Sequence, residues 1–291
     1  MKPKVAILNA GLHHEKAFQW AVDDRNFKYV YIEKLPTTPL EKFDVLIVPF
    51  HTDQIALYRN RGKLIGFLRW GGVLVLLGAT QEGSRAWIPY SSWQREYTTS
   101  LVIASENDDA NMIFKDIPAE DLKFHGYYYA HGWLLPGGKF DILAYDEHKQ
   151  VVMFVRRDGF RGSLLCTTLD PDFHSIAEVP GPKGHNPTDT RQKADKLLQR
   201  IVLWATEEAK QKGYFLRIVR RGFGYFANTV STVLFWAVLI LPAIVLYWLL
   251  SSKSTPLLQN PTAYTVDLLS LAGSGSTMWQ HWRSWKAARR E

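Results

Sequence analysis

FDVLIVPF, residues Phe43–Phe50, is an apolar run that lacks the polar alternation of a strand with one exposed face. Two similar runs flank it, KVAIL (Lys4–Leu8) and VLVLL (Val73–Leu77). Segments with the character of helices, His13–Asp24 and Ile55–Trp70, separate these runs. Continuous apolar strands that alternate with helices are typical of a parallel sheet covered by helices on both faces. The sequence therefore predicts an α/β domain.

The rest of this domain carries weaker patterns. Residues 79–100 are expected to form a long loop rich in Trp, Tyr and Ser, and HGYYYAHGW (His125–Trp133) is an aromatic segment containing two glycines. Further strands are predicted at Tyr29–Leu35, Phe140–Tyr145, Val151–Arg156 and Ser163–Leu169. Asn107–Leu122 is predicted to be a helix and a turn, with a break at Asp116-Ile117-Pro118, and Thr190–Lys212 a long helix. Together these elements predict one cytosolic domain over residues 1–212.

VSTVLFWAVLILPAIVLYWLL, residues Val230–Leu250, carries no charged side chain. A bilayer core is crossed by roughly 20 apolar residues in a helix, so this segment is long enough to span one. Pro242 inside it would break a soluble helix but often only kinks a membrane helix. We predict a transmembrane helix here; the alternative is a buried core or dimerisation helix.

The flanks of this segment predict its orientation. Residues 213–229 form a basic connector, whereas only Lys253 follows the apolar segment closely. The positive-inside rule therefore predicts an inner-membrane protein whose N-terminal domain lies in the cytoplasm. Residues 251–291 are a linker and a tail with a basic end, in which Ala263–Trp282 either crosses the bilayer again or lies in its surface as an amphipathic helix.

Charge and cysteine content narrow the partners. The formal charge of the chain is +7. Residues 214–291 hold eight of the 35 Lys and Arg and only two of the 28 acidic residues, so they carry +6 of this charge. This basic excess suits anionic membrane lipid and leaves the domain without an electrostatic reason to bind nucleic acid. Cys166 is the only cysteine, so no disulfide forms within the chain, in keeping with a reducing compartment.

Polar side chains follow several of the predicted strands, where ligands bind in parallel α/β sheets. His125 and His131 in the aromatic segment are expected near the same edge. For each single histidine the alternative is a turn cap or a solvent-facing side chain. The residues that we predict to bind a ligand are Asn9, His13, His51, Asp53, Thr80, His131, Asp170, Asp172 and His174.

The run FDVLIVPF, a helix and then RWGGVLVLLGAT (Arg69–Thr80) resemble the class I glutamine amidotransferase-like superfamily. RGSLLCTTLDPDFHS (Arg161–Ser175), followed by a helix ending in LLQRIVLWA, is similar to its ThuA-like branch. The resemblance covers about residues 4–206. It implies a flavodoxin-like, doubly wound, mostly parallel sheet, to which this chain adds the C-terminal membrane segment.

This sequence departs from the superfamily where glutaminase chemistry takes place. The strand VLVLL leads into Gly78-Ala79-Thr80 rather than into a cysteine or serine on a tight turn, and no GxCxG or GxSxG occurs. His13, His51, Asp172 and His174 are ligand-competent, and Asp-x-His is a feasible zinc or iron pair, but no tight motif such as HExxH supports a metal. We therefore predict no catalytic residue, no metal and no cofactor.

These observations favour a membrane-anchored, non-catalytic domain that binds a small ligand or a protein partner in the cytosol and couples it to the membrane segment. Such a sensor or effector subunit is expected to be a homo-oligomer or part of a membrane complex. The first alternative is a ThuA-like enzyme acting on a sugar derivative through His51, Asp172 and His174. The second is a structural tether that docks a cytosolic complex through the aromatic loop Trp87–Tyr97.

Overall fold

The computed structural model describes residues 2–21, 23–78, 91–125, 128–176 and 190–212. All of them fall within the first of two compact units of the chain, Met1–Arg220. The predicted connector, transmembrane helix and tail lie outside the described residues, as does Thr80. In the described ranges, no helix combines the length and the apolar character that crossing a membrane requires.

Ten strands and several short helices make up the described domain. The strands are β1 Val5–Asn9, β2 Phe27–Tyr31, β3 Val45–Val48, β4 Val73–Leu77, β5 Ser91–Gln94, β6 Val102–Ile103, β7 Trp133–Pro136, β8 Asp141–Tyr145, β9 Val151–Arg156 and β10 Ser163–Thr167. The helices are α1 Leu12–Ala17, α2 Gln54–Arg59, α3 Arg61–Arg69, α4 Asp108–Ile113, α5 Pro171–His174 and a long helix over residues 190–212. Single 3₁₀ turns are η1 Gln19–Ala21, η2 Ile32–Lys34, η3 Leu40–Lys42 and η5 Ala119–Leu122.

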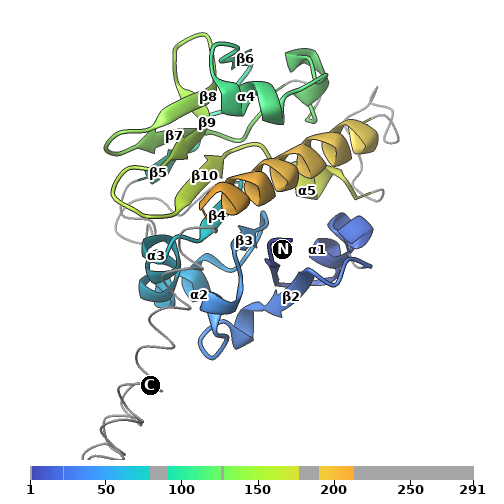
Figure 1. Ribbon diagram of the computed structural model, residues 1–291. Helices are drawn as coiled ribbons and strands as arrows, with labels where there is room; N and C mark the ends of the chain where they lie inside the picture. Colours follow the sequence, from blue (N-terminus) through green and yellow to red (C-terminus); the bar gives the residue numbers. More distant parts are fainter. Residues whose placement is uncertain (1, 22, 79–90, 126–127, 177–189, 213–291) are drawn as a thin grey trace, which may run out of the picture. The chain divides into compact units, whose positions relative to one another are not determined.

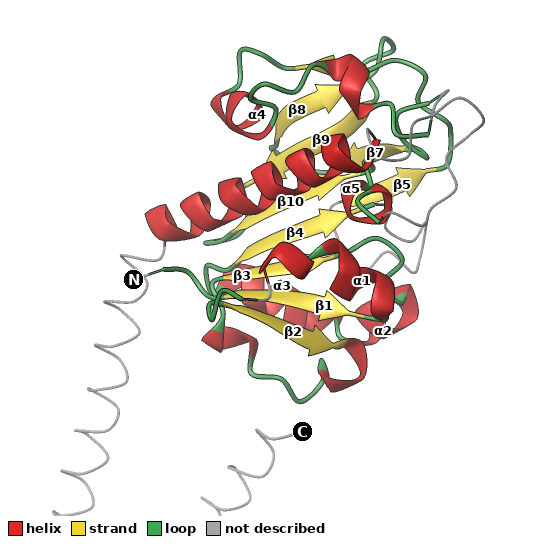
Figure 2. Cartoon of the chain, turned by 90° about the vertical axis from the view of Figure 1, so that its right-hand side faces the viewer, coloured by secondary structure: helices red, strands yellow, loops and turns green. Residues whose placement is uncertain are grey.

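One half of the sheet is parallel. Its strands follow the order β2-β1-β3-β4-β10, and each neighbouring pair runs in the same direction. This is the 2-1-3-4-5 order of flavodoxin-like folds, with β10 as the fifth strand. The predicted α/β class and its parallel sheet are confirmed for these five strands, which all end at the same edge (Figure 2).

The other half is antiparallel. β9 pairs with β10 through a short hairpin, and β7, β5, β8 and β6 continue the sheet beyond it. Six residues connect β9 to β10, which is too short for the crossover that a parallel pair needs. The sheet is therefore parallel only from β2 to β10. The prediction of a mostly parallel sheet holds for this half and not for the strands beyond it.

Helices cover both faces of the parallel half (Figure 1). Because alternate residues of a strand point to opposite faces, Val5 and Ile7 of β1 pack with α1 and the 190–212 helix, whereas Ala6 and Leu8 pack with α2 and α3. Trp204 of the long helix is almost completely buried in the first of these cores. The two cores fix the edge at which β1, β3, β4 and β10 end.

Some predicted elements differ in extent. β4 and β9 have the predicted bounds, but the helix expected over His13–Asp24 ends at Ala17, where η1 brings Phe18 and Ala21 into the core. The helix expected over Ile55–Trp70 is two helices that meet at Asn60. The short helix α5 follows β10, at a position where no helix was predicted.

Candidate functional site

The candidate site lies at the edge where the parallel strands end. His13 and His14 follow β1 in α1, Phe50 and His51 follow β3, and the segment Asp170–His174 follows β10 and forms the start of α5 (Figure 2). Figure 2 shows α1 and α5 side by side at this edge, in agreement with their contacts. The strand order changes direction between β1 and β3, so this is also the switch point at which flavodoxin-like folds bind ligands.

His14 fixes the loop after β3 to the loop after β1. The Ala10 backbone N–H donates to His14 Nδ1 at 3.0 Å, so Nε2 carries the proton and donates to the Phe50 carbonyl oxygen at 2.7 Å. Burial lowers the pKa of His14 to about 4, an effect reinforced by His13 and His51 and opposed by the bond to Phe50. His14 is therefore a neutral structural residue.

Asp172 ties the loop after β10 to the same backbone. Its Oδ2 accepts the Phe50 N–H at 2.8 Å, and its side chain is buried. Its second oxygen, Oδ1, has no hydrogen-bond partner among the described groups. Burial and the neighbouring Asp170 raise the pKa of Asp172 to about 7, although backbone N–H groups oppose the shift. A carboxyl group of this kind is able to exchange a proton near neutral pH.

Asp170 lies at the centre of three histidines. Its Oδ1 accepts from His125 Nε2 at 3.2 Å, and its Oδ2 lies 3.7 Å from both His131 Nε2 and His174 Nε2. His125 Nδ1 lies 3.2 Å from His174 Nε2. Burial would raise the pKa of Asp170, but the bond from His125 and the charges of the three imidazoles lower it. Asp170, Asp172, His125, His131 and His174 are called the Asp170 cluster below.

Aromatic rings line the outer side of this cluster. Tyr128 stacks on His125 with 4.4 Å between the ring centroids. The ring centroid of the exposed Tyr97 lies 4.4 Å from that of Tyr128. Phe50 stacks between His51 and His131, at centroid distances of 4.0 and 6.0 Å. The rings connect the histidines at the ends of β1 and β3 to the Asp170 cluster.

The predicted site residues fall into two groups. The structure brings His13, His51, His131, Asp170, Asp172 and His174 together at one edge. Asn9 instead accepts from the Gly11 N–H and donates to Glu15, and Asp53 caps α2 by accepting from the backbone N–H groups of Ile55 and Ala56. These two side chains have structural hydrogen bonds that account for them.

His125 was not among the predicted ligand-binding residues, although it is the residue that connects Asp170 to His174. Its signal in the sequence is the second histidine six residues later, His131, in the same aromatic segment. Among the described residues between His125 and β7, the only strand pairing is an isolated bridge from Ala130 to Thr98, so no helix or strand period relates the two histidines. Only the tertiary structure shows that both rings reach one carboxylate.

The turn after β4 begins with a glycine that no other residue can replace without strain. Gly78 has φ +80°, and a Cβ atom there would lie 2.0 Å from Cδ2 of Phe50. Cys166, in the middle of β10, is completely buried. A thiol at that position packs in the core and is not available as a nucleophile.

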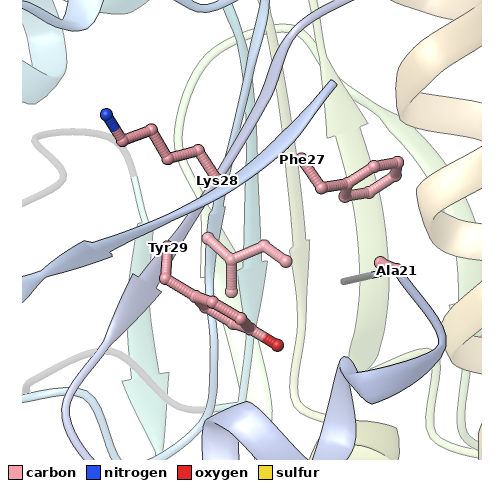
Figure 3. Close-up of a pocket in the computed structure, with 5 residues that line it drawn as sticks. Ala21, Phe27, Lys28 and Tyr29 are labelled. Atoms are coloured by element: carbon pink, nitrogen blue, oxygen red, sulfur yellow. The ribbon is translucent and has the colours of Figure 1, made fainter. Parts of the chain in front are cut away.

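Two hollows in the described part of the domain lie away from the strand ends. The smaller, of about 50 Å³, is lined by Ile7, Ala21, Phe27, Lys28 and Tyr29 and has room for little more than water (Figure 3). The larger, of about 300 Å³, lies between the N-terminus, β2 and the long helix. Neither contains the convergent histidines and carboxylates of the strand-end site.

Comparison with known proteins gives fold-level similarity only. No protein-family profile and no curated protein matches the sequence. A crystal structure of a ThuA-like protein from Bacteroides uniformis ATCC 8492 is similar at 11% identity and a TM-score of 0.41, over 69% of this chain and 91% of that one. The β-galactosidase from Bacillus circulans sp. alkalophilus has 12% identity and a TM-score of 0.35, over 68% of this chain and 31% of the galactosidase. Because both scores are low, the flavodoxin-like assignment rests on the strand order of this chain.

Proposed function

We propose that this domain binds a small polyhydroxylated ligand, of the sugar class, at the carboxyl edge of its parallel strands. The observation that carries the proposal is a pair of buried carboxylate oxygens, Asp170 Oδ2 and Asp172 Oδ1, without hydrogen-bond partners in the described structure. A buried acceptor without a donor costs about 1–3 kcal/mol, so a bound group that donates to it is strongly favoured.

The neighbouring imidazoles are suited to bind the hydroxyl groups of a ligand. Burial lowers the pKa values of His13, His51 and His131, so these imidazoles are largely neutral at pH 7 and both donate and accept. The exposed ring of Tyr97 beside Tyr128 offers an apolar face for a sugar ring. The motif resemblance to the ThuA-like branch implies the same substrate class.

Binding is tested on the purified full-length chain with glucose, galactose, sucrose and trehalose by calorimetry and thermal shift. Asp172→Asn keeps the acceptor for the Phe50 N–H but replaces the ionisable carboxyl, and we expect at least about tenfold weaker binding. Asp53→Asn is the matched control, because asparagine also caps a helix and Asp53 is occupied in capping α2. Absence of binding to the wild type, or equal effects of both variants, would contradict the proposal.

A second candidate function is catalysis on a sugar derivative. The raised pKa of Asp172 favours it, because a general acid or base is most effective when its pKa lies near the working pH. We nevertheless favour binding without cysteine-based covalent catalysis, since the turn after β4 begins with Gly78 and Cys166 is buried in the core. Chromatography of each saccharide after prolonged incubation decides between the two functions. Conversion by the wild type that is lost in Asp172→Asn favours the enzyme.

The membrane part of the proposal concerns residues outside the described ranges. We propose that residues 230–250 anchor the domain on the cytosolic side and that the anchored chains associate with each other. A double substitution, Leu239→Arg with Ile240→Arg, places two charges at the centre of the span, at a cost of about 2.5–3.5 kcal/mol each. We expect this variant, but not Leu257→Arg with Leu258→Arg in the linker, to be released from membranes by alkaline carbonate. Release of the wild type under the same conditions would refute the anchor.

A further inference from the structure

We infer that the Asp170 cluster is a binding site for a divalent transition-metal ion, held by His125, His131 and Asp170. The inference deepens the proposed function, on which it rests for the place where a ligand binds. One donor atom from each of the three residues lies within 4.8 Å of the others. Two imidazoles and one carboxylate are a donor set found in zinc and non-haem iron sites.

The distances between the donor atoms fit a metal centre. Ligand atoms about 2.0–2.2 Å from a tetrahedral zinc ion lie roughly 3.3–3.6 Å from one another. His125 Nε2 is 3.2 Å from Asp170 Oδ1, and His131 Nε2 is 3.7 Å from Asp170 Oδ2. These two distances end on different oxygens of Asp170, so the three side chains reach one ion after rotation of the carboxylate and imidazole groups about their torsion angles.

The hydrogen bonding of Asp170 gives independent support for a cation site. The residue is completely buried, yet Oδ2 has no hydrogen-bond partner in the described structure while two imidazole nitrogens lie 3.7 Å away. A second carboxyl group, Asp172, is buried beside it. The ion pairs that the described structure gives Asp170 are with histidines and not with Arg or Lys, so two adjacent buried carboxyl groups are costly there, and a divalent ion offsets that cost.

His174 has the position of a residue that orients a metal ligand. If His125 binds the ion through Nε2, its Nδ1–H donates to His174 Nε2, which lies 3.2 Å away. Metal-bound histidines nearly always donate their second ring N–H in this way, which fixes the tautomer and the direction of the ring. His174 is thus a positioning residue for His125.

The donor set also predicts which ions bind. Imidazole nitrogen favours Zn²⁺, Co²⁺, Fe²⁺ and related ions, whereas Mg²⁺ and Ca²⁺ take oxygen ligands almost exclusively. We therefore expect Zn²⁺ and Co²⁺ to bind in the presence of excess Mg²⁺. Cobalt gives a visible absorption spectrum that reports on histidine ligation.

The test uses the untagged full-length chain, stripped with a chelator, reloaded with Zn²⁺ or Co²⁺ and then desalted. We expect about one ion per chain in the wild type and at least about 100-fold weaker binding in Asp170→Asn and His131→Gln. His174→Gln is expected to weaken binding about 10–100-fold. His148→Gln, an exposed histidine in a turn, is the control and should bind as the wild type does.

His131→Gln keeps the test informative if Asp170→Asn does not fold, because His131 is only partly buried. Wild-type protein without stoichiometric Zn²⁺ or Co²⁺, or with binding that survives both substitutions, overturns the inference. Saccharide binding to the chelator-treated protein, measured in parallel, separates the two proposals. Saccharide binding without metal binding refutes only the metal site, whereas metal binding without saccharide binding refutes only the proposed ligand.

Discussion

Two groups of buried acidic side chains lie at opposite ends of β10, and they are completed in different ways. The Asp170 cluster follows the carboxyl end of the strand, and two of its carboxylate oxygens have no hydrogen-bond partner in the described structure. At the amino end, Arg157 binds both Asp109 and Glu208, and these three residues with Ser163, Trp204 and Lys212 are called the Arg157 cluster. We propose that a ligand completes the first cluster, whereas the second provides its own partners.

The Arg157 cluster shows what a completed set of acidic groups looks like in this chain. Arg157 donates to both oxygens of Glu208 at 2.9 and 3.0 Å and to both oxygens of Asp109 at 2.9 and 3.0 Å. Burial would raise the pKa of Glu208, but the hydrogen bonds from Arg157 and Ser163 lower it. A carboxylate in the same domain with an unused oxygen, as in Asp170, is therefore not a general property of the fold.

The largest effect is expected when the Arg157 cluster loses its cation. Arg157→Met leaves the buried Glu208 and its neighbour Asp109 without a bidentate partner, which costs about 3–5 kcal/mol of unfolding free energy. Denaturant unfolding of the full-length chain measures the loss. Arg191→Met, which breaks an exposed pair with Asp195 at 3.9 Å, should cost less than about 1 kcal/mol. Similar losses in both variants would mean that the Arg157 cluster contributes no more than a surface pair.

The next effect concerns pH at the carboxyl edge. Because the folded pKa of His14 is about 4 and the unfolded value is near 6.5, the unfolded chain binds the extra proton as pH falls through this window. The stability of the wild type should decrease by about 3 kcal/mol between pH 6.5 and pH 4 relative to His14→Gln, which does not titrate. The measurement is the difference between the two proteins at each pH, in which other acid-labile groups cancel. A constant difference would contradict the assignment of His14 as a neutral buried bridge.

Asp172 contributes to stability with the opposite sign over an overlapping pH range. Its folded pKa of about 7 lies above its unfolded value of 3.8, so its effect on stability is favourable at low pH and is lost as pH rises from about 4 to about 7. His14 and Asp172 both bind the backbone of Phe50: His14 donates to its carbonyl oxygen, and Asp172 accepts from its N–H. His14→Gln isolates the first contribution because Asp172 is present in both proteins that are compared.

A third prediction compares one carboxylate from each cluster at pH 8 in the presence of a chelator. Glu208→Gln removes the charge that Arg157 needs and should cost about 2 kcal/mol. Burial opposes the charge of Asp170 while its histidine neighbours favour it, so the two effects offset each other and Asp170→Asn should change stability by less than about 1 kcal/mol. Thermal unfolding midpoints of the two variants provide the measurement. A larger loss in Asp170→Asn than in Glu208→Gln would show that the metal-free Asp170 cluster is already electrostatically complete.

The strands whose residues are all buried were the ones that the sequence predicted best. Val73–Leu77 and Val151–Arg156 are buried throughout, and their bounds were predicted correctly. The antiparallel half was less clear: β7 begins inside the aromatic segment, and β5 and β6 lie at the ends of the sheet paths with exposed residues. In these strands, pairing partners rather than local composition determine the structure.

The site was predictable from strand ends but not from side-chain identity alone. His13, His51, Asp170 and His174 follow parallel strands, so their common edge follows from topology. Asn9 and Asp53 also lie at or beyond the ends of parallel strands, but their side chains hydrogen-bond to nearby backbone N–H groups, as Asn and Asp often do at turns and helix starts. They are therefore not part of the cluster of site residues. His125 comes from a segment without periodicity, and only long-range packing brings it to Asp170.

The smallest predicted effect examines how far the Arg157 cluster depends on its outermost member. Lys212 is the last described residue before the basic connector, and its Nζ donates to the Gly162 carbonyl oxygen at 3.0 Å and lies 3.4 Å from Glu208. Burial lowers its pKa even though Glu208 opposes the shift. Lys212→Met should cost about 1 kcal/mol, whereas Lys210→Met, which breaks an exposed pair with Glu207, should cost about half of that or less.

Denaturant unfolding of the two lysine variants and of Arg157→Met gives the measurement. If Lys212→Met costs as little as Lys210→Met, Arg157 alone satisfies Glu208, and the cluster is complete without the end of the long helix. If the loss approaches that of Arg157→Met, the two cations act as one unit, and the expected small contribution of Lys212 is refuted. The first outcome sharpens the contrast with Asp170, because a single basic side chain then does at one end of β10 what a bound cation is proposed to do at the other.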